Sequence, residues 1–202
     1  MTAMRRRVYG MLAIALSGLL IAAPVRATVS ADSSTPTALH GETDGDAAAD
    51  RQAVSREIER FRSSSISINQ AMAIAEARHA GATTADVSFD GGSGVPVYRV
   101  QTLHNDRIWR HTINAETGEV MGGEAALPLA ELDGDDRSNL AALGTITHRL
   151  ADAVRVAERA ASGKAISGGL VRERGRLNFA IVVISGDDLK EVILEPPGAR
   201  GK

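Results

Sequence analysis

Apolar side chains recur at helical spacing shortly after residue 65 of the chain. They occupy Ile68, Ala71, Met72 and Ala75, and His79 continues the same face, at spacings of three, four, seven and eleven from Ile68. Ser67 precedes this face and Gln70 follows three residues later, the spacing of a capping box that satisfies backbone amides at a helix start. Gly81 stands where a left-handed C-terminal residue is favoured. The pattern therefore predicts one amphipathic helix whose two ends are encoded locally.

Three stretches with alternating apolar and polar residues follow this helix. The first contains Val87 and Phe89, the second runs from Val95 to Leu103, and the third runs from Ile108 to Ile113. A Gly-rich loop separates the first two, and a His-Asn-Asp turn separates the last two. Period-two runs joined by short turns are typical of consecutive antiparallel strands, so the pattern predicts a three-stranded meander.

The end of the third predicted strand carries a recognisable motif. The Tyr98-x-Val100 strand and the turn Asn114-Ala115-Glu116-Thr117-Gly118-Glu119-Val120 resemble the PepSY domain, whose pattern ends in a strand followed by D-x-x-T-G-x-V. Asn114 replaces the usual Asp, and its amide can make the same bond to the turn backbone. The resemblance covers residues 65–122 and implies a cystatin-like fold, with a helix packed across a curved antiparallel sheet. An amphipathic helix and a one-faced sheet would cover each other in that way.

A weaker copy of the same pattern lies between residues 145 and 202. Its helical positions are Leu150, Ala153, Val154, Ala157 and Ala161, an offset of 82 from the first set. Arg149 replaces the capping Ser67, and Glu195-Pro196-Pro197-Gly198 replaces the Thr-Gly turn, so this second PepSY-like domain is degenerate. An internal duplication explains the pattern. The predicted fold class is α+β, with two cystatin-like PepSY units that each pack a helix on a three-stranded antiparallel β-meander. The units are expected to join by strand edges or by the backs of their sheets, and the linker is long enough to let them move apart instead.

The remaining segments are predicted to be leader, spacer and linker. Residues 1–27 have three early Arg, an apolar run and a small-residue end, which indicates a cleaved signal peptide; an uncleaved anchor is the alternative. Residues 28–50 are polar and aperiodic, which predicts a disordered spacer. Residues 51–64 predict a short helix, and residues 123–144 predict a linker.

Charge and cysteine content narrow the classes of partner. Loss of residues 1–27 would remove four Arg and no acid, changing the net charge from −2 to about −6. A mildly acidic chain without a basic stripe argues against nucleic acid and anionic membrane surfaces as partners. The chain contains no Cys, so neither a disulfide nor a lipid-bearing cysteine is available.

Searches for catalytic and metal-binding patterns find none that satisfy their spacing rules. The five His are scattered without a zinc-like pair, so no metal and no cofactor are predicted. Asp133, Asp135 and Asp136 suggest a calcium loop, but Gly144 stands where the loop needs a bidentate Glu. No Ser has the setting of a nucleophile elbow. The sequence therefore predicts that the protein is not an enzyme.

The function expected from the resemblance is an exported, periplasmic or secreted, non-enzymatic binding module that modulates or inhibits a peptidase. An extended partner segment would pair with an exposed sheet edge. The candidate partner contacts are Trp109, Tyr98, Asn114, Thr117 and Gly118, with core packing as the alternative for Trp109. A sensor that binds a small ligand or ion between the units, and a structural envelope protein, are the other hypotheses. A polar cavity between the units would favour the sensor, and an open, uncharged strand edge would favour the binding module.

Overall fold

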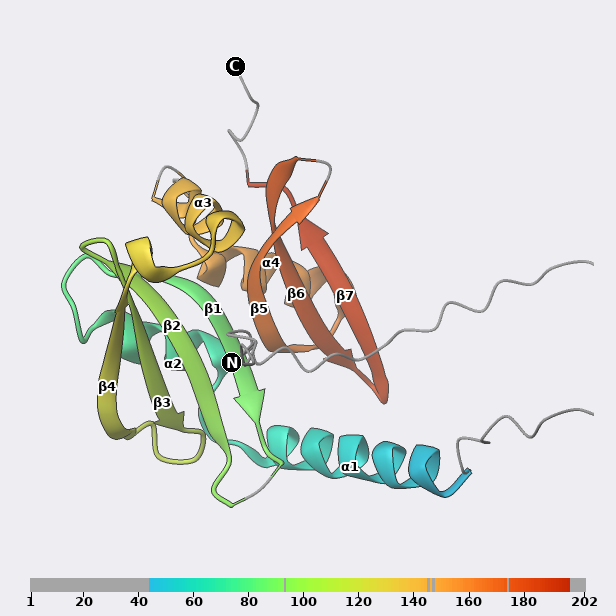
Figure 1. Ribbon diagram of the computed structural model, residues 1–202. Helices are drawn as coiled ribbons and strands as arrows, with labels where there is room; N and C mark the ends of the chain where they lie inside the picture. The colour runs from blue at the N-terminus through green and yellow to red at the C-terminus, as the bar shows by residue number, and fades with distance from the viewer. Residues whose placement is uncertain (1–43, 93, 145, 147, 174, 197–202) are drawn as a thin grey trace, which may run out of the picture. The chain divides into compact units, whose positions relative to one another are not determined.

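The computed structural model describes residues 44–92, 94–144, 146, 148–173 and 175–196. Figure 1 shows helices α1 (Asp44–Ser63), α2 (Ile68–Glu76), α3 (Gly134–Leu143) and α4 (Leu150–Ala161), with a 3-10 turn, η1 (Leu129–Glu131). The strands are β1 (Thr83–Asp90), β2 (Val97–His104), β3 (Arg107–Asn114), β4 (Val120–Pro128), β5 (Lys164–Glu173), β6 (Arg176–Ser185) and β7 (Asp188–Leu194). The mixed helix and strand content confirms the predicted fold class.

All seven strands belong to one antiparallel sheet in the order β4-β3-β2-β1-β5-β6-β7. The β1–β2–β3 meander and the β5–β6–β7 meander meet where β1 pairs with β5, through Asp86–Gly169, Val87–Gly168 and Ser88–Ser167. Of the arrangements that the sequence left open, which were joined strand edges, packed sheet backs and separated units, the structure therefore has joined strand edges.

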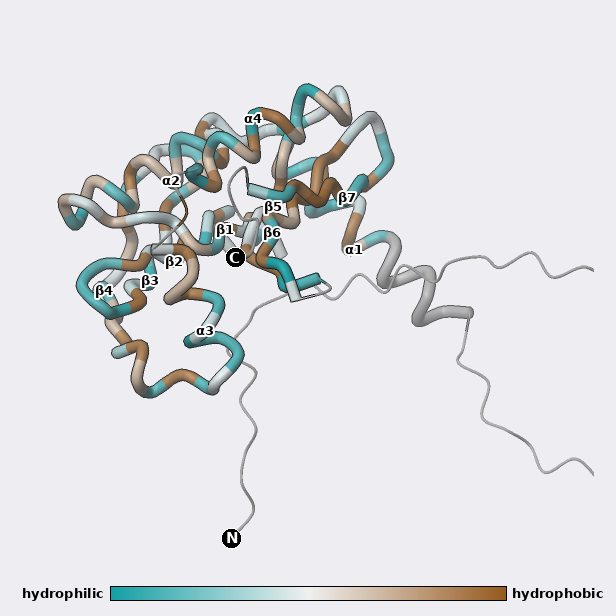
Figure 2. Tube along the Cα trace, turned by 90° about the horizontal axis from the view of Figure 1, so that it is seen from above, coloured by the Kyte–Doolittle hydropathy of each residue, from teal (hydrophilic) through white to brown (hydrophobic). Residues whose placement is uncertain are grey.

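Helices α2 and α4 cover the same face of this sheet, while α3 lies on the other side (Figure 2). The predicted helix face of α2 is buried at Ile68, Ala71, Met72 and Ala75, and Ser67 and Gln70 form the predicted capping box. In the second half, the predicted helix face of α4 is buried at Leu150, Ala153, Val154, Ala157 and Ala161. One hydrophobic core runs under both helices.

The predicted linker, residues 123–144, contains regular structure. It holds most of β4, which adds a fourth strand to the first unit, and all of α3. Asp133 is the N-cap of α3, since its Oδ1 accepts a hydrogen bond from the amide of Asp136 at 3.0 Å. The aspartates that suggested a calcium loop thus begin a helix.

The N-terminal predictions fall partly outside the described residues. The signal peptide and residues 28–43 of the predicted spacer lie outside them, whereas residues 44–50 belong to α1. Helix α1 also includes the predicted short helix up to Ser63, and its Phe61 packs edge-on against Phe89 of β1 at 5.3 Å. No helix in the described part of the chain is long and apolar enough to cross a membrane.

Candidate functional site

Strand β4 forms one outer edge of the sheet, and its composition differs from that of the opposite edge, β7. Its nine residues include one charged side chain, Glu124. Strand β7 carries Asp188, Lys190 and Glu191 within seven residues. Charges on an edge strand discourage pairing with another chain, whereas an uncharged edge leaves its backbone groups available. The open, nearly uncharged edge is therefore β4.

The hydrogen-bond register shows which groups of β4 are available. The amide of Leu129 donates to the Asp106 carbonyl at 2.9 Å, and the register continues with Ile108 opposite Leu127 and Trp109 opposite Ala126. Bonded and non-bonded pairs alternate along an antiparallel ladder. The N–H and C=O of Ala126 consequently point away from β3, toward the place of an added strand.

A bulge in β4 turns one side chain toward the helices. Arg110 faces Ala125 and Thr112 faces Met121, so residues 122–124 all lie opposite His111. Gly122 accommodates this detour with a φ of 72°. The result is that Glu124 reaches the end of α2.

Glu124 is the centre of a cluster drawn from three parts of the fold, which we call the Glu124 cluster: Arg78, His79, Trp109, His111 and Glu124. Arg78 Nε donates to Glu124 Oε1 at 2.6 Å, His79 Nε2 lies 3.4 Å from Oε2, and His111 Nδ1 lies 3.7 Å from Oε1. The His79 ring packs against the Trp109 indole at an angle of 36°, with centroids 3.9 Å apart.

The electrostatics of the Glu124 cluster follow from these contacts. The hydrogen bond from Arg78 holds the pKa of Glu124 below its usual range, so the carboxylate is charged at neutral pH. Burial lowers the pKa of His111, whose side chain is fully buried and whose Nε2 lies 3.1 Å from Thr102 Oγ1. His111 is therefore neutral at neutral pH.

Three buried nitrogen atoms of this cluster have no hydrogen-bond partner within the described residues: His79 Nε2, Trp109 Nε1 and His111 Nδ1. Buried polar atoms are nearly always paired, because leaving one unpaired costs about 1–3 kcal/mol. No group of three potential ligands in the described part of the chain has the geometry to hold a metal ion. The cluster is thus a polar site of hydrogen-bond donors and acceptors beside the open edge.

Three of the sequence-derived contact residues form the turn after β3. Asn114 Oδ1 accepts hydrogen bonds from the amides of Glu116 and Thr117 at 2.8 and 3.1 Å, the bond expected from an Asn in this motif. Gly118 has a φ of 76°, and a Cβ there would lie 3.2 Å from Ile74 of α2. The turn therefore sets the approach of the chain to α2.

The other two contact residues have different environments. Tyr98 is 1% exposed and its hydroxyl donates to the Ile66 carbonyl at 2.8 Å, so we assign it to the core and not to a partner surface. Trp109 is half-buried against His79. Trp109 and Asn114 lie five residues apart along β3, about 17 Å, so the predicted set does not form one site.

Arg78, His111 and Glu124 were not among the contact residues expected from the sequence, and His79 was expected only as part of the helix face. These side chains come from a helix end, an inner strand and a strand that was predicted to be linker. A single signal pointed to Glu124: it follows a Gly-Gly pair, which marks a bulge when it lies within a strand.

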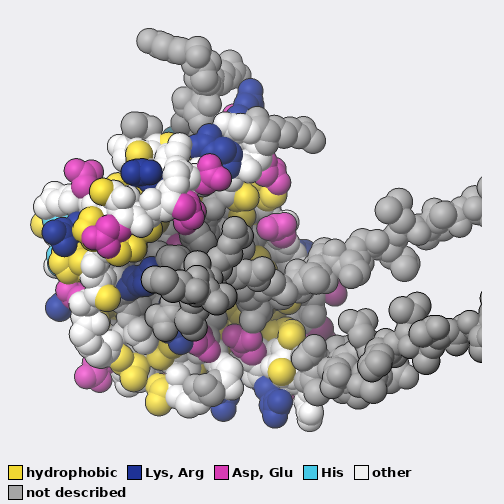
Figure 3. Space-filling model, viewed as in Figure 1, with side chains coloured by type: hydrophobic (Ala, Val, Ile, Leu, Met, Phe, Trp, Pro, Cys, Tyr) yellow, Lys and Arg dark blue, Asp and Glu magenta, His cyan; other side chains and the backbone are white. Residues whose placement is uncertain are grey.

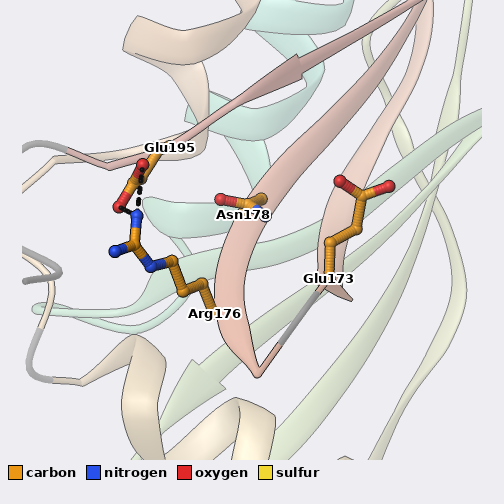
Figure 4. Close-up of a pocket in the computed structure, with 4 residues that line it drawn as sticks. All are labelled: Glu173, Arg176, Asn178 and Glu195. Atoms are coloured by element: carbon orange, nitrogen blue, oxygen red, sulfur yellow. Dashed lines mark hydrogen bonds and ion pairs between the residues drawn. The ribbon is translucent and has the colours of Figure 1, made fainter. Parts of the chain in front are cut away.

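Two hollows lie in the second half of the sheet or beside it. One, of about 520 Å³, is lined by Glu173, Arg176, Asn178 and Glu195 (Figure 4), and Arg176 is already paired with Glu195 at 2.9 Å. The other, of about 480 Å³, is lined by residues of both halves, including Tyr98, Glu158 and Lys164.

On the face opposite α2 and α4, acidic and basic side chains are interspersed with hydrophobic ones (Figure 3).

One comparison with known proteins, with family models, agrees with the resemblance noted in the sequence. Residues 65–124 match the family model PepSY, "Peptidase propeptide and YPEB domain". The fold is similar to the 1.85 Å crystal structure of a lipoprotein candidate from Clostridium difficile 630, with 16% identity and a TM-score of 0.39 over 67% of this chain and 90% of that chain. The comparison with curated proteins gives no match. The chain thus contains a PepSY domain match that spans α2, β1, β2, β3 and the bulged start of β4.

Proposed function

We propose that this protein is an exported, non-enzymatic binding module that restrains a peptidase by accepting an extended partner segment along β4. The observation that carries the proposal is the open, nearly uncharged edge of β4, which begins inside the PepSY match. PepSY domains are propeptide-like or inhibitor-type modules, which supports a peptidase as the partner. An exported location, periplasmic or secreted, is supported by the predicted signal peptide.

Strand addition would use the backbone for affinity and the side chains for selectivity. An antiparallel strand next to β4 would bond to outward-pointing groups such as those of Ala126, and alternate side chains would contact either face of the sheet. The second edge, β7, is a poorer acceptor because its charges oppose strand pairing. Of the two outer edges of the sheet, β4 is therefore the one that we propose accepts the partner strand.

The test is inhibition of purified secreted peptidases of the metallo, serine and cysteine classes by the full chain and two variants. Ala126→Pro removes an outward N–H without removing a bond to β3, and Ala126→Val keeps that N–H as the matched control. We expect the native chain and Ala126→Val to inhibit the same peptidase of this panel, and we expect Ala126→Pro not to inhibit it. Circular dichroism and melting would verify that the proline variant folds. Inhibition that survives Ala126→Pro, or no inhibition of any class by the native chain, would reject the proposal.

A ligand sensor is the second candidate, favoured by the hollow of about 480 Å³ to which both halves of the sheet contribute. Two of its charged groups are engaged elsewhere, since Glu158 accepts a hydrogen bond from the Ala165 amide and Arg62 pairs with Asp187. A thermal-shift screen of small molecules against the native chain and Lys164→Gln tests this alternative.

A further inference from the structure

The geometry points to a preference of the β4 edge for an extended segment that carries an acidic side chain beside Glu124 and Ala126, held by Arg78. This inference rests on the proposed function, because it names the chemistry of the strand that β4 accepts. It goes further in assigning selectivity to the Glu124 cluster, which sequence analysis did not identify.

Arg78 has unused bonding capacity at this edge. Its Nε donates to Glu124, and its two terminal nitrogens have no partner within the described residues. The side chain is 51% exposed, so those nitrogens can meet a partner. A guanidinium offers five donors in a planar fork and binds carboxylates through two of them. Arg78 can therefore hold Glu124 and a second carboxylate together.

The charges around the edge complement an acidic residue. Arg107 lies on the neighbouring strand β3, on the same face as Trp109, and has no ion-pair partner among the described residues, whereas Arg110 points to the other face. Against Arg107 and Arg78, β4 supplies the single negative charge of Glu124. The rings of His79, His104 and His111 lie near one another on the same side of the sheet. A basic segment would meet repulsion here, whereas an acidic one would meet attraction.

The register leaves room for such a side chain. A strand added to β4 would lie about 4.8 Å beyond it, with its side chains in line with those of β4. Ala126 is exposed and small, and it faces Trp109, whose buried indole N–H has no acceptor among the described residues. An acidic residue beside Ala126 would project over the methyl group toward the donors of the Glu124 cluster.

Selection from random nine-residue linear peptides displayed on phage tests the inference, using the native chain, Arg78→Gln, Ala126→Pro and the control Arg155→Gln. Arg155 lies on α4 and pairs with Asp152, so its replacement removes the same charge away from β4. We expect the native chain and Arg155→Gln to select peptides with Asp or Glu at one position. Arg78→Gln should bind extended peptides without that preference, and Ala126→Pro should bind none.

A second measurement depends on no variant of the protein. The best peptide selected by the native chain is synthesised with its acidic residue and with the corresponding amide. The amide form should bind about tenfold more weakly, as expected for a charge-assisted hydrogen bond, and the difference should shrink in high salt.

Equal binding of the acid and amide peptides, or an acidic preference that persists in Arg78→Gln, overturns the inference while strand binding stands. Failure of the native chain to select any peptide overturns the proposed strand-edge function, and this inference falls with it. The two failures are therefore distinguishable.

Discussion

Replacement of Asp86 by Asn should stabilise the protein at neutral pH. Asp86 lies where β1 meets β5, opposite Gly169, and a Cβ on Gly169 would stand 2.5 Å from its Oδ2. Burial raises the pKa of Asp86 from its ordinary 3.8 to about 6, and no nearby positive charge offsets this rise. A shift of about two units corresponds to at most about 3 kcal/mol of unfavourable free energy in the charged form, less to the extent that the carboxylate keeps solvent contact.

The sign of the pH dependence follows from the raised pKa. The contribution of Asp86 to stability is most favourable when the group is protonated in both states, below pH 3.8, and it is lost as pH rises through about 6. Asp86→Asn removes this decrease because Asn does not ionise. The variant should exceed the native chain by about 0.5 kcal/mol or less at pH 4 and by about 1–3 kcal/mol at pH 7.5, a rise in Tm of about 2–10 °C at the higher pH.

Urea unfolding at pH 4, 5, 6 and 7.5 measures this difference, with Asp90→Asn as the matched control on the same strand. Asp90 accepts a hydrogen bond from Arg99 Nη2 at 2.6 Å, which lowers its pKa. Its replacement should therefore lower stability at neutral pH, and the loss should disappear as pH falls through that lowered pKa. A gain for Asp86→Asn of equal size at pH 4 and pH 7.5 would refute the desolvation argument.

Two further predictions concern packing and charge. Gly163→Ala should lower the free energy of unfolding by about 1–3 kcal/mol or more, because the added Cβ would clash with the Ile184 carbonyl. Gly123→Ala is the control, since Gly123 has open space around it and its replacement should change stability little. Urea unfolding of the two variants measures the difference. Arg78→Gln should raise the pKa of Glu124 toward its ordinary value, since the Arg78 hydrogen bond is the largest cause of its lowering; an unchanged carboxyl titration by NMR would contradict this assignment.

Local signals predicted the elements that have a buried face or a specific cap. Ser67 and Gln70 specified the start of α2, and Asn114 specified the turn after β3, because each acts on backbone groups within three residues. The joint between β1 and β5 was one of three arrangements that the sequence allowed. Pairing between residues some 80 positions apart depends on tertiary packing, and the spacing of apolar residues along the chain does not reveal which strands pair.

Strand β4 and the Glu124 cluster illustrate what the sequence could not predict. An edge strand with five exposed residues in a nine-residue span, including Gly122 and Gly123, lacks the alternation that identifies strands. Without β4, Glu124 had no predicted position, and His79 and His111 had no common neighbour. The cluster forms only because a bulge places residues 122–124 opposite one residue of β3.

The short pairing between β1 and β5 has a consequence for the colloidal behaviour of the chain. Three residue pairs join these strands, and each strand would become an unprotected edge if the halves were separated. Unprotected edges template intermolecular pairing. A chain cut between α3 and α4 should therefore yield halves that precipitate or assemble into aggregates when produced singly and remain dispersed when produced together. The fusion of two units in one polypeptide thus protects two strands from aggregation and leaves β4 as the uncharged edge.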